Sequence, residues 1–209
     1  MDAIRPKTVA PRQLRAVETR RRLLAAVETI VAAEGSDAVT TTRVAQALGV
    51  AVGTIYRYFD DREALLLAAY DSTVERIVAD CARVLERLPR DLSTAQAGGV
   101  LLAAYLAAAE AVPAHVGLLK AMRAIRPIEA DQKGDAQQGI LYDLFMPFLA
   151  RYLPDVTSVA PAKLAFLTVM IGTMVDHYLM ADPADRPVLR REIEAHIGLL
   201  ATRIGMPSP

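Results

Sequence analysis

The chain has 209 residues, enough for one large domain or for a small domain joined to a larger one, and 53% of them are hydrophobic. Its single cysteine, Cys81, excludes an internal disulfide framework. The net charge is zero, yet residues 1–59 carry nine Lys or Arg against five Asp or Glu, which favours a polyanionic partner or a solvated basic arm. The N-terminus lacks the apolar stretch of an export signal, and the most apolar run, residues 164–175, is too short to span a bilayer. We therefore expect a cytoplasmic protein that binds no membrane.

The first sixty residues predict a flexible arm followed by three helices. Residues 1–12 contain two prolines and no periodicity, which is typical of an arm. Apolar residues then recur at the spacing of an amphipathic helix, at Leu23, Leu24, Val27, Ile30 and Val31. Gly35 is expected to end this helix, and Thr40 is a suitable N-cap for the next one. Gly49 breaks that second helix, and a short third helix is predicted over residues 51–58.

The remaining residues predict a long connecting helix and five further helices. Residues 60–63 resemble a capping box and open the long helix, which Pro89 ends. Ser93 begins a helix that is apolar nearly all round, as expected of a buried one. The other predicted elements are a helix from Pro113 to Ile125, a loop over 126–138, and helices over 140–152, 162–180 and 184–204. The pattern predicts an all-α fold of about nine helices.

Two short helices joined by a turn with Gly49 are a candidate helix-turn-helix. Apolar side chains occupy the positions that two crossed helices must bury, namely Val44, Leu48, Val50, Ile55 and Tyr58. Thr40, Thr41 and Thr42 place hydroxyls at the start of the first short helix, where hydroxyls and backbone amides hold phosphate. The second helix projects groups that contact phosphates and base edges in a major groove: Gly53, Thr54, Tyr56 and Arg57.

The run from Ala45 to Leu66 resembles the TetR (tetracycline-repressor-like) family of bacterial regulators. The signature lies in Gly49-Val50, Gly53-Thr54-Ile55-Tyr56, Tyr58-Phe59, Arg62 and Leu65-Leu66, in matching order and spacing. The resemblance implies a basic arm over residues 1–12, a three-helix DNA-binding domain over 13–60, and a helical effector-binding and dimerisation domain over 61–209.

The same resemblance implies roles for individual residues. Thr54 and Tyr56 would hold phosphates, and Arg57 would reach a phosphate or a base. Arg62 would clamp a phosphate, and Thr42 stands where the family often contacts a base. The arm, with Arg5, Lys7, Arg12 and Arg15, would enter the neighbouring minor groove.

The chain departs from the family pattern at three positions. Ala51 and Val52 replace the usual Ser and basic residue, so one cap hydroxyl and one positive charge are lost. Val52 can instead meet a thymine methyl, and Arg43 stands where an acidic residue is common, which restores charge. The predicted DNA-binding residues are Thr40, Thr41, Thr42, Arg43, Val52, Gly53, Thr54, Tyr56, Arg57 and Arg62.

Two apolar stripes near the C-terminus have the spacing of a helical interface. One comprises Leu164, Leu167, Ile171 and Met174, and the other Leu189, Ile193, Ile197 and Leu200. Two such helices from each of two chains would form a four-helix bundle, as the resemblance also implies. The alternative is that both stripes face the chain's own core. A twofold dimer would set two recognition helices about 34 Å apart on a palindromic double-stranded DNA operator.

The other C-terminal helices supply soft and aromatic side chains for a cavity that holds a small-molecule effector. The candidate ligand-binding residues are Tyr105, Met122, Arg123, Tyr142, Phe145, Phe166, Met170 and His177. The alternative is that these side chains are ordinary core. A bound ligand would shift the population towards a spacing of the two DNA-binding domains that no longer fits the operator, with residues 62–88 as the lever.

The sequence thus predicts a homodimeric repressor that a small, largely apolar ligand releases from its operator. The alternative, suggested by Ala51 and Val52, is a dimeric ligand-binding or interaction module of the same fold whose DNA binding is weak or lost. We expect no catalytic residues, metal or cofactor, since no nucleophile–base pair or metal-ligand spacing is found. Only Asp176-His177 is a suggestive pair.

Overall fold

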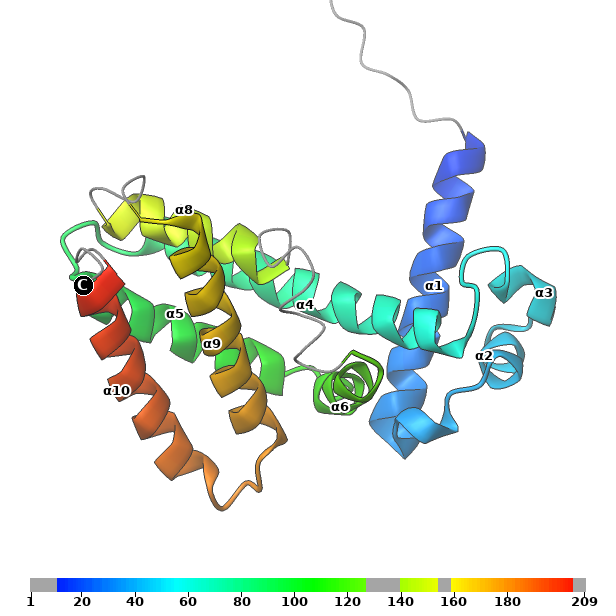
Figure 1. Ribbon diagram of the computed structural model, residues 1–209. Coiled ribbons are helices and arrows are strands. Elements are labelled where there is room, and N and C mark those ends of the chain that lie inside the picture. The colour runs from blue at the N-terminus through cyan, green and yellow to red at the C-terminus, as the bar shows by residue number, and fades with distance from the viewer. Residues whose placement is uncertain (1–10, 127–139, 154–158, 205–209) are drawn as a thin grey trace, which may run out of the picture.

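The structure, a computed structural model, describes residues 11–126, 140–153 and 159–204. Over these ranges the chain forms nine α-helices and one short 3-10 helix without any strand, which confirms the predicted all-α fold (Figure 1). The predicted loop over 126–138 lies almost wholly outside the described residues. The elements are α1 (Pro11–Glu34), η1 (Ser36–Ala38), α2 (Thr41–Leu48), α3 (Val52–Ile55), α4 (Arg62–Arg87), α5 (Thr94–Glu110), α6 (His115–Ile125), α8 (Ile140–Tyr152), α9 (Pro161–Met180) and α10 (Arg186–Ile204).

The head, residues 11–61, is a three-helix unit whose turns are set by individual side chains. The Oγ of Thr40 caps α2 by accepting a hydrogen bond from the backbone N–H three residues on, at 3.1 Å. Gly49 ends α2 with a φ of +64°, a left-handed conformation that glycine adopts without steric cost. Asp61 caps α4, since its carboxylate accepts from a backbone N–H at 2.7 Å. The boundaries predicted at Thr40 and Gly49 are confirmed. Helix α4 begins within the predicted residues 60–63, but its cap is Asp61, one residue later than a capping box with Glu63 requires.

Helix α1 is longer than the sequence predicts, because it begins at Pro11 rather than near residue 20. Proline is tolerated in the first helical turn, where its missing N–H has no helical partner, and residues 12–22 contain no helix breaker. None of the side chains of residues 13–22 is buried, so these turns extend past the head core (Figure 1). Residues 1–10, which hold most of the predicted arm, lie outside the described residues.

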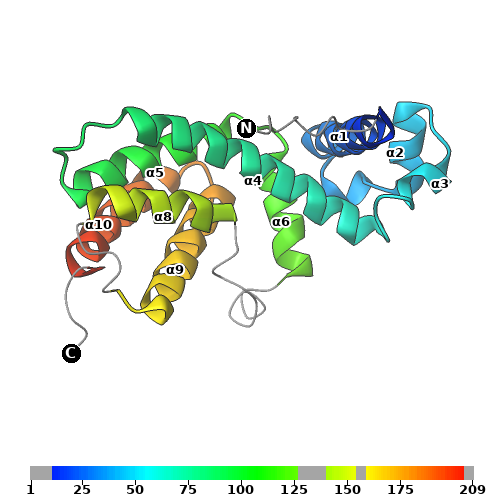
Figure 2. The same ribbon diagram turned by 90° about the horizontal axis from the view of Figure 1, so that it is seen from above.

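Two hydrophobic cores divide the molecule. The head core joins α1, α2 and α3, through side chains such as Val27, Val44 and Ile55, to the first two turns of α4. It extends past residue 60, the boundary predicted from the sequence. The body, residues 62–204, has its own core, built from the rest of α4 and from α5, α6, α8, α9 and α10. Figure 2 shows α4 running from the head into the body, so one helix belongs to both cores.

The body is assembled around α5, which is apolar nearly all round, as predicted, and packs against α4 and α10. Ser93 and Gln96 form a capping box at its start. Cys81 of α4 is fully buried in this core, and burial raises the pKa of its thiol to about 11. No single helix in the described ranges has the length and apolar character to cross a membrane; only α5 and α6 together do, and they are bent by 97°.

Helix α6 contacts both parts of the molecule, since it packs on α1 of the head and on α4, α5 and α9 of the body. Its closest approach to the head is at Gly117. A Cβ placed there would lie 2.6 Å from Cγ1 of Val31 in α1, closer than two carbon atoms can approach. Gly117 is therefore required by the contact between the two helices.

His115, the first residue of α6, is buried against α4. Its Nδ1 lies 3.1 Å from the Oγ of Thr73, and its ring stacks on Tyr70 with 5.8 Å between centroids. Because the Thr73 hydroxyl already donates to the carbonyl of Tyr70, Nδ1 donates to that hydroxyl, which fixes the tautomer. Burial lowers the pKa of His115 to about 4, so the ring is neutral in the folded protein near neutral pH.

The contact at Gly117 predicts a specific stability effect. Gly117→Ala should lower the free energy of unfolding by about 1–3 kcal/mol in urea denaturation, because the new methyl overlaps Val31. Adding Val31→Ala removes the overlap. The double variant should therefore lose less free energy of unfolding than the two single variants lose together. Gly99→Ala on α5, whose Cβ would meet nothing within 4 Å, is the control and should cost no stability. Simple additivity of the two changes would contradict the clash.

The low pKa of His115 predicts a loss of stability in acid. The unfolded chain binds the proton near pH 6.5 and the folded chain only near pH 4, so protonation favours unfolding as the pH falls between these values. The loss should reach at most about 3 kcal/mol, read from unfolding curves at several pH values. His115→Gln should flatten the dependence, whereas His196→Gln, at an exposed position, should keep it. Equal slopes for the two variants would refute the assignment.

Candidate nucleic-acid interface and ligand pocket

Helices α2 and α3 meet at the outer edge of the head (Figure 1). Val44, Ala45 and Ile55 are buried between them, as predicted for crossed helices. Helix α3 begins at its N-cap Ala51, which makes no side-chain capping hydrogen bond. The start of α3 therefore lacks a side-chain cap, as expected because Ala51 stands where the family usually has a serine.

The exposed face of these helices carries most of the predicted polar groups. Tyr56, at the end of α3, is 54% exposed although it is a large aromatic residue, and Arg57 beside it is exposed too. The Tyr56 hydroxyl lies 3.4 Å from the Oγ of Thr41, which ties the start of α2 to the end of α3. Gly53 and Thr42 are exposed on the same two helices. These groups are therefore available to a partner outside the head.

The other residues predicted to bind DNA from α2 and α3 are partly engaged within the head. The Thr40 hydroxyl is used as the α2 cap, and Arg43 forms an ion pair with Glu34. Val52 and Thr54 are half-buried, and Val52 packs against the head core.

Arg62, the predicted phosphate clamp, makes two hydrogen bonds within the head. Its Nε donates to the carbonyl oxygen of Val39 and one Nη to that of Ser36, each at 2.8 Å. The guanidinium thereby joins the start of α4 to the segment before α2, and an Asp37 carboxylate oxygen lies 3.8 Å from its Nη2. A guanidinium has five N–H donors, so these two bonds leave donors for a phosphate, and that contact stays a prediction.

Two basic residues that the sequence assigned to the arm, Arg12 and Arg15, lie on α1, because this helix begins earlier than predicted. Arg15, Arg21 and Arg22 are exposed on its first turns, although Arg21 also pairs with Glu18. The guanidinium of Arg20 stacks over the ring of Phe59 at 5.6 Å from its centroid. The absence of a helix breaker after Pro11 is the signal that would have extended this helix. Arg5 and Lys7 lie outside the described residues, and so does the side chain of Arg12.

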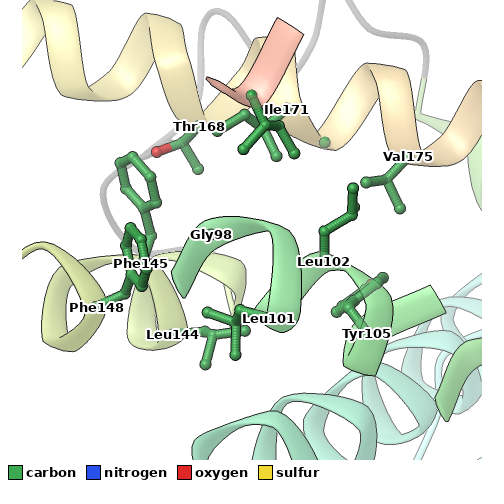
Figure 3. Close-up of a pocket in the computed structure, with 12 residues that line it drawn as sticks. Gly98, Leu101, Leu102, Tyr105, Leu144, Phe145, Phe148, Thr168, Ile171 and Val175 are labelled. Carbon is green, nitrogen blue, oxygen red and sulfur yellow. The ribbon is translucent and has the colours of Figure 1, made fainter. Parts of the chain in front are cut away.

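A pocket in the body opens between α5, α8, α9 and α10, and its empty space, including the mouth, is about 700 Å³. Side chains from α5, α8 and α9 converge on it in Figure 3. Its walls are formed by Gly98, Leu101, Leu102, Tyr105, Leu144, Phe145, Phe148, Thr168, Ile171, Gly172, Val175 and Ile197. Of the predicted ligand-binding residues, Tyr105 and Phe145 line this pocket.

The other predicted ligand-binding residues lie elsewhere. Arg123 forms an ion pair with Asp176, in which its Nε donates to the carboxylate at 2.7 Å. Phe166 and His177 are exposed on the outer side of α9. Met122 is buried in the body core, Met170 packs against that core, and Tyr142 is half-buried; none of these three lines the pocket. The soft and aromatic side chains predicted to line one cavity are therefore divided among the pocket, the core and the surface.

The two stripes expected to form the dimer interface face the chain's own core, the alternative that the sequence left open. Leu164, Leu167 and Ile193 are buried there. The remaining five, Ile171, Met174, Leu189, Ile197 and Leu200, are half-buried and pack against the same core. Other apolar side chains of α9 and α10 are exposed, and this set, here called the outer stripe, comprises Phe166, Val188 and Leu199.

No group of three or more His, Cys, Asp or Glu side chains suited to a metal ion occurs within the described residues.

The head, with its crossed α2 and α3 and an exposed polar face, defines a helix-turn-helix protein with an all-helical body. Residues 23–69 match the model of the bacterial regulatory proteins of the tetR family. The part of the chain that carries this resemblance is the head and the start of α4.

A curated relative is the HTH-type transcriptional repressor KstR of Mycolicibacterium smegmatis, which is 42% identical over 66 residues. That match covers 32% of this chain and 32% of the relative, so it spans about a third of the relative's length. Among solved structures, the TetR family repressor AlkX from Dietzia sp. strain DQ12-45-1b matches 90% of this chain and 97% of its own, with a TM-score of 0.63 and 17% identity.

FadR from Bacillus subtilis, solved in complex with stearoyl-CoA, matches 90% of this chain and 99% of its own, with a TM-score of 0.60 and 13% identity. At these identities the solved structures share the fold of the whole described chain. The sequence relationship itself rests on the head and the start of α4.

Proposed function

We propose that this protein is a transcriptional repressor that binds double-stranded operator DNA through the exposed face of α2 and α3. The observation that carries the proposal is the pair Tyr56 and Arg57, which project from the end of α3 with no role in the core. A phenol and a guanidinium in this position suit phosphates and base edges of a major groove. The basic excess of residues 1–59 supports the same partner.

The first turns of α1 add a second contact to this proposal. Arg15 and Arg22 stand one heptad apart on an exposed part of the helix. They extend the positive charge of the head beyond α3, towards neighbouring phosphates. The contact would be electrostatic and independent of sequence, so it contributes affinity rather than specificity.

The proposed repressor acts as a homodimer. Phe166 on α9 and Leu199 on α10, both of the outer stripe, are 65% and 63% exposed although they are large apolar side chains. A second copy that packs its own α9 and α10 on this surface would complete a four-helix bundle. Twofold symmetry then presents two heads to a palindromic operator.

The body would bind a small-molecule effector in the pocket between α5, α8, α9 and α10. Two proteins of similar fold support this, since FadR was solved with stearoyl-CoA and RolR with resorcinol. The pocket lies in the same core as α6 and the second half of α4, and both helices also contact the head. A ligand that favours one packing of this core therefore changes the position of the heads and releases the operator.

The second candidate is a ligand-binding module of the same fold with weak DNA binding. The uncapped start of α3 at Ala51 favours it, because a helix start without a cap hydroxyl holds phosphate less well. Operator binding separates the two candidates.

A gel shift with the DNA upstream of the chain's own gene tests the proposal. We expect binding that exceeds binding to unrelated duplex and weakens steeply with salt. Arg57→Ala should lower the affinity about tenfold and reduce the slope of log affinity against log salt by about 1, because one phosphate contact is lost. Tyr56→Phe should weaken binding by a smaller factor, because only the hydroxyl is removed.

The matched control for this experiment is Arg90→Ala, which removes an exposed arginine between α4 and α5, far from α3 in the fold. It should leave both the affinity and the salt slope unchanged. If Arg57→Ala and Arg90→Ala behave alike, α3 is not the binding face. If the wild-type protein prefers no sequence, the weak-binding module is the better description.

The dimer makes a separate prediction. Phe166→Glu combined with Leu199→Glu places charge on both helices of the outer stripe, so the sedimentation mass should fall from that of a dimer to that of a monomer. Leu14→Glu is the control, since Leu14 is an equally exposed leucine on α1, outside the stripe. A wild-type monomer, or a double variant that keeps the dimer mass, would exclude α9 and α10 as the interface.

A further inference from the structure

The described residues that line the pocket include no charged side chain. Ten of the twelve lining residues are glycine, aliphatic or phenylalanine, and only Tyr105 and Thr168 bring a polar atom. The Thr168 hydroxyl donates its hydrogen to the carbonyl oxygen of Leu164 in its own helix at 2.9 Å. Thr168 is therefore left as an acceptor, and the Tyr105 hydroxyl is the one side-chain donor of the described wall.

Tyr105 is 7% exposed, and its hydroxyl is not one of the fully enclosed polar atoms without a partner in the described part of the chain. The hydroxyl therefore reaches the open space of the pocket, where it can donate to a ligand oxygen in place of water. Other buried hydroxyls of the body, those of Thr73, Tyr152 and Tyr178, are paired within the fold.

The charges near the pocket offer no counter-charge to an anionic ligand. The candidate cation Arg123 is held in its ion pair with the buried carboxylate of Asp176, so these two charges largely cancel each other. None of the described wall residues is charged, so an anion in the pocket would be buried without a partner.

We propose that the effector is an uncharged, largely apolar molecule with one hydrogen-bond acceptor, such as a ketone, ester or ether oxygen, which the Tyr105 hydroxyl recognises. Carboxylates and phosphates are excluded by the uncompensated cost of burying their charge. The proposal rests on the regulatory function proposed above and specifies the chemistry of its ligand.

Gly98 offers a way to close the pocket from its wall. A Cβ at Gly98 would lie 3.3 Å from Ile197 and 3.6 Å from Phe148, both of which line the pocket. A larger side chain there grows into the space that a ligand needs. Gly99, its neighbour on the same helix, faces open space and bears no such contact. Gly98→Val should therefore fill part of the pocket, whereas Gly99→Val, the same substitution at the next residue of the helix, should not.

The experiment uses the full chain and two fluorescent probes. One is the neutral naphthyl ketone prodan, and the other is the naphthoate with the same dimethylamino group, in which a carboxylate replaces the ketone. Titrations followed by probe emission should give the ketone at least tenfold tighter binding than the carboxylate. Tyr105→Phe should weaken ketone binding about three- to tenfold and shift its emission to shorter wavelength, because the hydrogen bond to the carbonyl is lost. Gly98→Val should weaken it more than tenfold and Gly99→Val should not.

Three results would overturn the proposal: equal binding of ketone and carboxylate, unchanged emission with Tyr105→Phe, or equal effects of Gly98→Val and Gly99→Val. If Gly98→Val unfolds the protein, as circular dichroism would reveal, Tyr105→Phe and the probe comparison decide. A gel shift of the ligand-free protein is run in parallel. Loss of ketone selectivity with operator binding intact refutes the ligand chemistry alone, whereas selective ketone binding without operator binding refutes the repressor function alone.

Discussion

Helix α4 must satisfy two hydrophobic cores at once, and the arrangement of the molecule depends on this constraint. Its first turns bury Leu65 and Leu66 in the head core, and its later turns bury Ile77 and Cys81 in the body core. A close-packed core does not deform smoothly, so a change in the body moves the helix as a unit. Helix α6 adds a second connection, because Gly117 leaves no space between it and α1. Head and body are therefore coupled by packing rather than by a flexible linker.

Much of the fold was predictable, because local chemistry and tertiary packing agree in the head. Thr40, Gly49 and Asp61 act where their side chains or backbone freedom predict, since capping and positive φ are local effects. The start of α1 was missed because periodicity is visible only where a helix buries one face. The turns after Pro11 bury no side chain over residues 13–22, so only the helix propensity of their residues could have predicted them.

The candidate site was predicted less completely, and the reasons differ among its residues. Tyr56 and Arg57 were found because their exposure follows from the short helix that carries them. The internal hydrogen bonds of Arg62 were not predicted, since no sequence pattern reveals that two carbonyl oxygens lie within reach of its guanidinium. The stripes of α9 were ambiguous because this helix is apolar on more than one side. Such a helix carries apolar side chains on two faces, and only the three-dimensional packing shows which face is buried and which is exposed.

The burial of Cys81 has a practical consequence for measuring movement. Its thiol is enclosed in the body core, and its raised pKa leaves almost no thiolate at neutral pH, so alkylating dyes react with it very slowly. Because it is the only cysteine of the chain, one new cysteine on the outer surface of the head would carry the chain's sole fluorophore. In the proposed dimer, energy transfer between two such labels would report the distance between the two heads, in solution and during a ligand titration, without removing any native residue.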